Sequence, residues 1–159
     1  MLIITLAISI FLVIADQIIK LFVVNYLQPV GSVTVIDNIF KLTYVENRGV
    51  AFGMFSDMRW FFIIVTSLMI FLIIFFIVRK KPKDKIVYFC SALIVGGGIG
   101  NLIDRILYGY VIDYLSLSFF PPVCNFADYC ITAGVIIFSV YILFFSDAFK
   151  DKPKEKVES

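Results

Sequence analysis

Two aspartates, Asp113 and Asp128, bracket a 14-residue loop between apolar stretches of this 159-residue chain. A turn through Pro121-Pro122 would bring both carboxylates to one place. Two carboxylates held close together in a partly dry site share a proton, and the pair can activate a water molecule and protonate a leaving group. This is the chemistry of aspartic proteases, and it needs neither histidine nor metal. The alternative for Asp128 is a structural role as a helix N-cap, because residues 125–128 directly precede an apolar run.

The absence of histidine from the chain excludes several other chemistries. Neither a Ser-His-Asp nor a Cys-His nucleophile system can be built, and the same holds for His-rich zinc sites. We expect no metal and no cofactor. Cys90, Cys124 and Cys130 form no C-x-x-C pair, so we expect small apolar residues rather than a disulfide framework. A Cys124–Cys130 disulfide is the alternative if that end of the chain faces an oxidising space.

The composition places the chain in a membrane, since 61% of its residues are hydrophobic and only 16% are charged, against about a quarter charged in soluble domains. Its uncharged runs are Met1–Ala15, Trp60–Val78, Ile86–Ile103 and Tyr129–Ser146. About 20 apolar residues span a bilayer as a helix. We therefore predict an all-α bundle of four transmembrane helices. The first helix must continue past Asp16 and Lys20, which stand one turn apart and can pair.

A cleaved signal peptide is the alternative for the N-terminal run. It lacks support, because no basic region precedes the run and no small-x-small site follows it.

Basic residues indicate the orientation. Nine of the 14 Lys and Arg residues fall within residues 79–85 and 150–156, and the positive-inside rule places both segments in the cytoplasm. With four spans, both termini are cytoplasmic. We predict one transmembrane domain over residues 1–148 and a charged cytoplasmic tail over residues 149–159. The tail mixes both charge signs, so it is predicted to be a solvated end and not a nucleic-acid-binding arm.

The other side of the membrane holds residues 27–59 and 108–128. Gly31–Ile36 and Ile39–Val45 have the composition of short strands, with Asp37-Asn38 as the turn between them. We predict a small extracytoplasmic β-sheet between helices 1 and 2, with an outer β-region over about residues 31–56. Its larger apolar side chains either anchor it among lipid headgroups or form its own core; these are Phe40, Leu42, Tyr44, Phe52, Met54 and Phe55.

Charges at the ends of apolar spans need partners or a role, because a charge at the bilayer centre costs about 2.5–3.5 kcal/mol. Asn101, Asp104 and Arg105 share one helix face. Arg105 is expected to pair with Asp104 or Asp16, or alternatively to bind a lipid phosphate. The glycines at 96–98 and 100 are predicted to permit close helix contact, since a phosphate-binding loop would need a preceding strand and a lysine.

Four motifs occur in order along the chain: D-Q-x-x-K at residues 16–20, N-x-G-x-A-F-G at 47–53, G-N-x-x-D-R with G-x-V-x-D at 100–113, and N-x-A-D at 125–128. Together they resemble the lipoprotein signal peptidase (signal peptidase II) family of bacterial intramembrane aspartic peptidases. The resemblance covers about residues 12–145. One departure is Cys124, where the family usually has phenylalanine, and it affects the expected local packing.

This resemblance implies that Asp113 and Asp128 are the catalytic dyad. It also implies a supporting set of polar residues and a glycine, namely Asp16, Lys20, Asn47, Gly49, Asn101, Asp104, Arg105 and Asn125. The implied substrate is a diacylglyceryl-modified prolipoprotein, cleaved just before its lipidated cysteine. We expect a monomer surrounded by membrane lipids in the bacterial cell membrane, with the active site toward the outer face and no nucleic-acid partner.

Three other classes of protein remain as alternatives. An ion-coupled transporter would place its ionisable groups near the midplane, whereas here they gather toward one side. A magnesium-dependent lipid head-group transferase would need a D-x₂₋₃-D cluster, which the sequence lacks. A noncatalytic membrane adaptor would tolerate substitution of its outer polar residues. Presenilin-like proteases are disfavoured because the G-x-G-D motif is missing.

Overall fold

The computed structural model describes residues 1–49 and 58–145. Its four long helices are α1 (Leu2–Phe22), α2 (Arg59–Lys80), α3 (Lys85–Leu107) and α4 (Phe126–Phe144), and α1 continues as the π-helical segment η1 (Val23–Leu27). All four are long and apolar enough to cross a membrane, which confirms the predicted count of spans. The predicted tail, residues 149–159, lies outside the described residues, and so do positions 50–56 of the predicted β-region.

Helix α1 passes through Asp16 and Lys20 without a break, as predicted, because the two side chains form an ion pair of 2.8 Å. Helix α2 ends where Lys81 adopts a left-handed conformation, with φ of 45°, and Pro82 follows. A residue of that conformation ends a helix, and a proline after it cannot continue one.

The sheet has four antiparallel strands in the order β1-β2-β3-β4. Strands β1 (Ser32–Ile36) and β2 (Phe40–Asn47) match the two predicted strands, and Asn38 has a positive φ of 58° in the turn between them. Strands β3 (Val111–Leu117) and β4 (Phe120–Cys124) lie between α3 and α4. The prediction of a sheet only between helices 1 and 2 was therefore incomplete, because β2 leaves an edge that β3 covers.

The predicted turn through Pro121-Pro122 was wrong. Both prolines lie within β4, and the chain turns at Ser118 and Phe119 instead. Proline is tolerated in β4 because this is an edge strand, where a missing N–H donor removes no required ladder bond.

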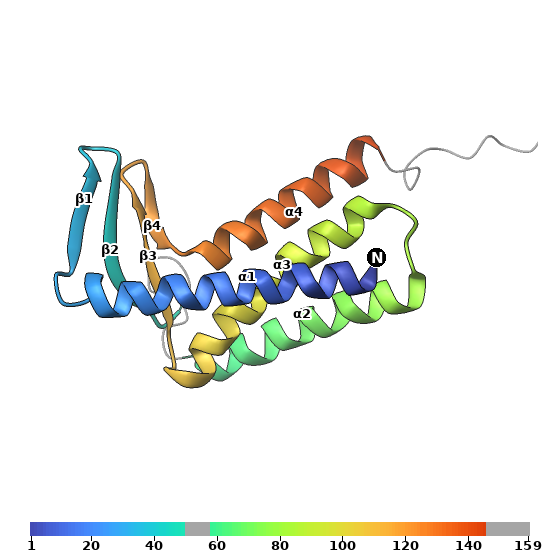
Figure 1. Ribbon diagram of the computed structural model, residues 1–159, viewed down its shortest axis with the longest axis horizontal. Coiled ribbons are helices and arrows are strands. Elements are labelled where there is room, and N and C mark those ends of the chain that lie inside the picture. The colour runs from blue at the N-terminus through green and yellow to red at the C-terminus, as the bar shows by residue number, and fades with distance from the viewer. Residues whose placement is uncertain (50–57, 146–159) are drawn as a thin grey trace, which may run out of the picture.

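The sheet lies at one end of the helix bundle, and α1 begins and α4 ends at the opposite end (Figure 1). The connection between α2 and α3 also lies at that far end. Segment η1 packs on the sheet through a small core of Val23, Leu27, Ile112 and Tyr114. Leu42 and Tyr44 pack against this core, which supports the core alternative for these two residues.

Helix α3 is the most buried of the four helices and contacts the other three. Its glycines allow this, as predicted. A Cβ atom at Gly97 would lie 2.5 Å from the backbone oxygen of Ala127 on α4, and one at Gly100 would lie 2.6 Å from a carboxylate oxygen of Asp16 on α1. No real side chain tolerates such distances, so glycine permits the two helices to approach α3.

Candidate active site

The aspartates Asp113 and Asp128 come together from different elements, β3 and the first turn of α4. Asn125 lies between them. Its Nδ2 donates to Oδ1 of Asp113 at 2.6 Å, and its backbone N–H donates to Oδ2 of Asp128 at 3.2 Å. Asp113 and Asn125 are buried, with exposed fractions of 1% and 0%. One asparagine therefore binds both carboxylates in a site with little solvent.

Asn125 is also the N-cap of α4. Its Oδ1 accepts a hydrogen bond from the backbone N–H of Asp128 at 2.9 Å, which completes a capping box with the Asp128 side chain. The alternative in which Asp128 is itself the N-cap is therefore wrong, because Asp128 is the third residue of the helix. The local sequence N-x-x-D forms the helix start and holds Asp128 through the same bonds.

Two further side chains bind the free N–H groups at this helix start. Oδ1 of Asp16, on α1, accepts from the backbone N–H of Ala127 at 3.2 Å. The hydroxyl of Tyr114, on β3, accepts from the backbone N–H of Phe126 at 3.2 Å. The first turn of α4 is thus attached to α1 and to the sheet. Sequence reasoning did not identify Tyr114, whose only signal was its place next to Asp113.

Three asparagine amides donate to the two carboxylates. Besides Asn125, Nδ2 of Asn47 donates to Oδ2 of Asp113 at 2.8 Å, and Nδ2 of Asn101 donates to Oδ1 of Asp128 at 2.7 Å. In each amide the oxygen is already occupied: Gly49 N–H donates to Asn47 at 3.0 Å, and Lys20 donates to Asn101 at 3.0 Å. Each amide is therefore oriented with its NH₂ group toward a carboxylate.

Lys20 forms ion pairs with two further carboxylates next to this site. Its ammonium lies 2.8 Å from Oδ2 of Asp16 and 2.8 Å from Oδ2 of Asp104, and it also donates to Asn101. The Lys20 side chain is only 2% exposed, so all three of its N–H donors bind buried partners.

Asp104 additionally accepts a hydrogen bond from the backbone N–H of Ile112 at 3.1 Å, which attaches α3 to β3. Gln17, a member of the first motif that sequence reasoning assigned no role, donates to Asp104 at 3.1 Å.

Arg105 does not form the predicted ion pair. Within residues 1–49 and 58–145 it has no salt bridge to Asp104 or Asp16, whose carboxylates Lys20 already binds. Arg105 follows Asp104 by one residue, which turns it about 100° around α3. Its guanidinium lies 5.0 Å from the ring centre of Phe62 on α2, and the negative charges that act on it are those of Asp128, Asp113 and Asp104. The cation therefore lies beside the dyad and toward α2.

The environment of Asp113 raises the pKa of its carboxyl group to about 7. Burial is the main cause, and the negative charge of Asp128 adds to it. The hydrogen bonds from Asn47 and Asn125 act in the opposite direction without restoring the ordinary value. A carboxyl group in this range exchanges a proton near neutral pH, which is what an acid–base catalyst requires.

The cysteines are all free thiols, so the alternative of a Cys124–Cys130 disulfide was wrong. Burial and the charges of Asp128 and Asp113 raise the pKa of Cys124 to about 11. This thiol therefore stays protonated and packs as a small, half-buried side chain where the resembling family has phenylalanine.

Four membrane-length helices, a sheet at one end of the bundle and two aspartates bound by one asparagine define a membrane protein with a candidate acid–base site. The family model described as signal peptidase (SPase) II matches residues 8–144. The chain belongs to the signal peptidase II family, as the sequence motifs indicated, and is thus a peptidase and a hydrolase.

Relatives and solved structures agree with this assignment. The chain is 43% identical to a lipoprotein signal peptidase of Caldanaerobacter subterraneus over 84% of this chain and 92% of the relative. It is 36% identical to one of Clostridium acetobutylicum over 85% and 90%. A solved bacterial membrane enzyme superposes with a TM-score of 0.81 at 30% identity, over 95% of this chain and 93% of the other. The signal peptidase class is therefore favoured over the transporter, transferase and adaptor alternatives.

Proposed function

We propose that this chain is a lipoprotein signal peptidase that cleaves the signal peptide of a diacylglyceryl-modified prolipoprotein just before the lipidated cysteine. Asp113 and Asp128 form the catalytic dyad, and water is the nucleophile. Family membership supports the reaction class. The observation that carries the dyad is the pair of hydrogen bonds through which Asn125 binds both carboxylates.

In this mechanism the dyad holds one proton, which Asp113 carries. Its raised pKa supports this choice. Asp128 is the carboxylate, since it lies in the first turn of α4, where the helix dipole and a backbone N–H favour negative charge. Asp128 removes a proton from water, the water oxygen bonds to the scissile carbonyl carbon, and Asp113 gives its proton to the carbonyl oxygen. Asp128 then donates the acquired proton to the leaving amine as the C–N bond breaks, and the diol returns a proton to Asp113.

The surrounding residues orient the dyad in this proposal. Asn47, Asn101 and Asn125 donate to the carboxylates and leave further lone pairs for water and substrate. Lys20 acts through Asn101, because its bond to the amide oxygen turns the NH₂ group toward Asp128. Arg105 offers a cation beside the dyad for a substrate carbonyl.

The lipid-linked substrate also determines where the enzyme works. We propose that residues 1–148 are one domain in the bacterial cell membrane, that the enzyme is a monomer, and that the sheet and the dyad face outward. Basic residues in the connection between α2 and α3, at the end of the bundle opposite the sheet, support this orientation through the positive-inside rule.

The test compares two forms of one precursor, with and without diacylglycerol on the cysteine, in vesicles that contain the full chain. We expect cleavage of the modified form only, with a new N-terminus at the lipidated cysteine. Equal cleavage of both forms would contradict the lipoprotein assignment even if the aspartates proved essential. Proton or ion flux in sealed vesicles without any cleavage would favour the transporter alternative.

A further inference from the structure

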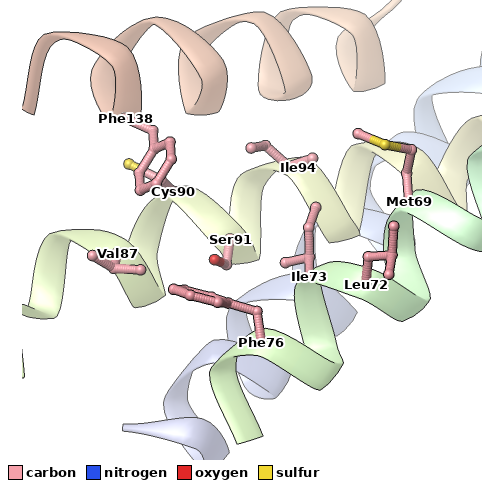
Figure 2. A pocket seen from close by; sticks show the side chains of 9 residues that line it. All are labelled: Met69, Leu72, Ile73, Phe76, Val87, Cys90, Ser91, Ile94 and Phe138. Carbon is pink, nitrogen blue, oxygen red and sulfur yellow. The ribbon is translucent and has the colours of Figure 1, made fainter. Parts of the chain in front are cut away.

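An apolar groove of about 340 Å³ runs along α3 in the half of the bundle away from the sheet. Figure 2 shows the side chains that line it. Met69 and Ile73 belong to the wall formed by α2, Phe138 extends from α4 toward Cys90, and Cys90 and Ser91 form part of a floor of small side chains on α3. The groove is therefore bounded by three of the four helices.

The groove opens toward the lipid because its two walls do not meet. Helix α2 packs against α3 but scarcely contacts α4, and the two helices lie on opposite sides of α3 (Figure 1). An apolar segment in the membrane can thus enter sideways between α2 and α4 and reach the floor on α3.

Part of the floor lies on the same face of α3 as Asn101 of the candidate active site. Val87, Ser91 and Ile94 follow the spacing of a single helix face. The same face leads to Asn101 through Gly98, where α2 covers it, since a Cβ atom at Gly98 would lie 3.4 Å from Ile70. Val87 and Ile94 lie about 14 and 7 residues before Asn101, or roughly 21 and 10 Å along the helix axis.

We propose that this groove binds the apolar helix of the substrate's signal peptide, an inference that rests on the proposed function. A signal peptide carries an apolar stretch of roughly 7–15 residues before its cleavage region. With the scissile bond at the dyad and a rise of about 1.5 Å per residue, the groove lies level with residues about 7–14 positions before that bond. One face of the helix packs its side chains between α2 and α4, above the small floor residues.

A second apolar groove of about 220 Å³ serves as a control surface. It is lined by Leu6 and Ile10 of α1, Ile74 of α2, and Val95 and Ile99 of α3. These α3 residues belong to a different face from the one that leads to Asn101. The adjacent residues Ile73 and Ile74 therefore face different grooves, which makes them a matched pair.

The first experiment places a photoreactive benzoylphenylalanine at Ile73 or at Ile74 in the full chain, in phosphatidylethanolamine–phosphatidylglycerol vesicles with a diacylglyceryl precursor. Cleavage is measured first, and adducts are then mapped by mass spectrometry. We expect position 73 to label the precursor about 7–14 residues before the scissile bond and position 74 to label lipid alone. If the precursor is cleaved but position 73 labels only lipid or a second copy of the chain, the proposal that the groove binds the signal peptide is wrong. Absence of cleavage by the unmodified chain overturns the proposed function.

The second experiment fills each groove from a lipid-exposed position. Met69→Trp should raise KM for the precursor about tenfold with kcat unchanged, because only substrate binding is impaired. Leu6→Trp, in the second groove, should change neither constant. Both side chains are exposed in the structure, at 53% and 44%, so neither variant disturbs the core. Equal KM values for the two variants would overturn the proposal.

Discussion

Replacing Asp113 with asparagine should remove a pH-dependent loss of stability. In the folded protein the pKa of this carboxyl is about 7, against an ordinary value of 3.8. The folded state therefore holds the proton more tightly than the unfolded state does, and the stability that the group contributes is full below about pH 4. It is lost as the pH rises to about 7 and stays lost above that. Each pKa unit is worth about 1.4 kcal/mol, so the loss approaches about 4 kcal/mol.

The assay measures thermal unfolding of the purified full chain from pH 4 to pH 9 in one detergent. The difference between the parent and the Asp113→Asn variant isolates the contribution of this group, and it should grow up to about pH 7 and then level off. The Asp128→Asn variant should still lose stability as the pH rises, but less than the parent does. This substitution removes the negative charge that adds to the effect of burial on Asp113. Asp37→Asn, in the exposed turn after β1, is the control. Parallel curves for the parent and Asp113→Asn would refute the electrostatic account of the site.

Three further substitutions test how the site is built. Lys20→Met should destabilise the protein by about 3–5 kcal/mol in thermal unfolding, because it leaves two buried carboxylates without a cation; Lys41→Met, on the exposed side of β2, should have little effect. Gly97→Ala should cost about 1–3 kcal/mol and reduce cleavage, since its Cβ would lie 2.5 Å from a backbone oxygen of α4, whereas Gly98→Ala meets its nearest atom at 3.4 Å and should be tolerated. Asn125→Ala should cost about 0.5–2 kcal/mol through the lost helix cap and lower kcat about 100-fold through displaced carboxylates, and equal kcat for variant and parent would contradict its bridging role.

The helices and half of the sheet could be predicted because their signals are local. Long uncharged runs predict spans whatever surrounds them, and the Asp16–Lys20 pair explains how α1 tolerates two charges. Strands β1 and β2 follow each other and are joined by a short turn. Strands β3 and β4 were not predicted, because β3 pairs with β2 across the whole length of α2 and α3, and a single sequence contains no signal for such a distant pairing.

The candidate site was predicted in its residue types but not in its bonds. The motifs include all three asparagines, but the orientation of each amide depends on which donor binds its oxygen. For Asn101 this donor is Lys20. The predicted ion pair of Arg105 was wrong for the same reason. Asp16 and Asp104 both bind Lys20 instead, and only the packing of α1 against α3 brings these three side chains together. Tyr114 was overlooked because its role lies in a hydroxyl that reaches a backbone N–H on another element.

The most direct test of the central claim measures cleavage of the diacylglyceryl-modified precursor by Asp113→Asn and Asp128→Asn in vesicles. Membrane insertion is confirmed for each variant, and Asp37→Asn serves as the matched control. Because both carboxyl groups transfer protons in the proposed mechanism, we expect no detectable product from either variant. The control should cleave the precursor at the rate of the parent. Substantial cleavage by either dyad variant would contradict the mechanism.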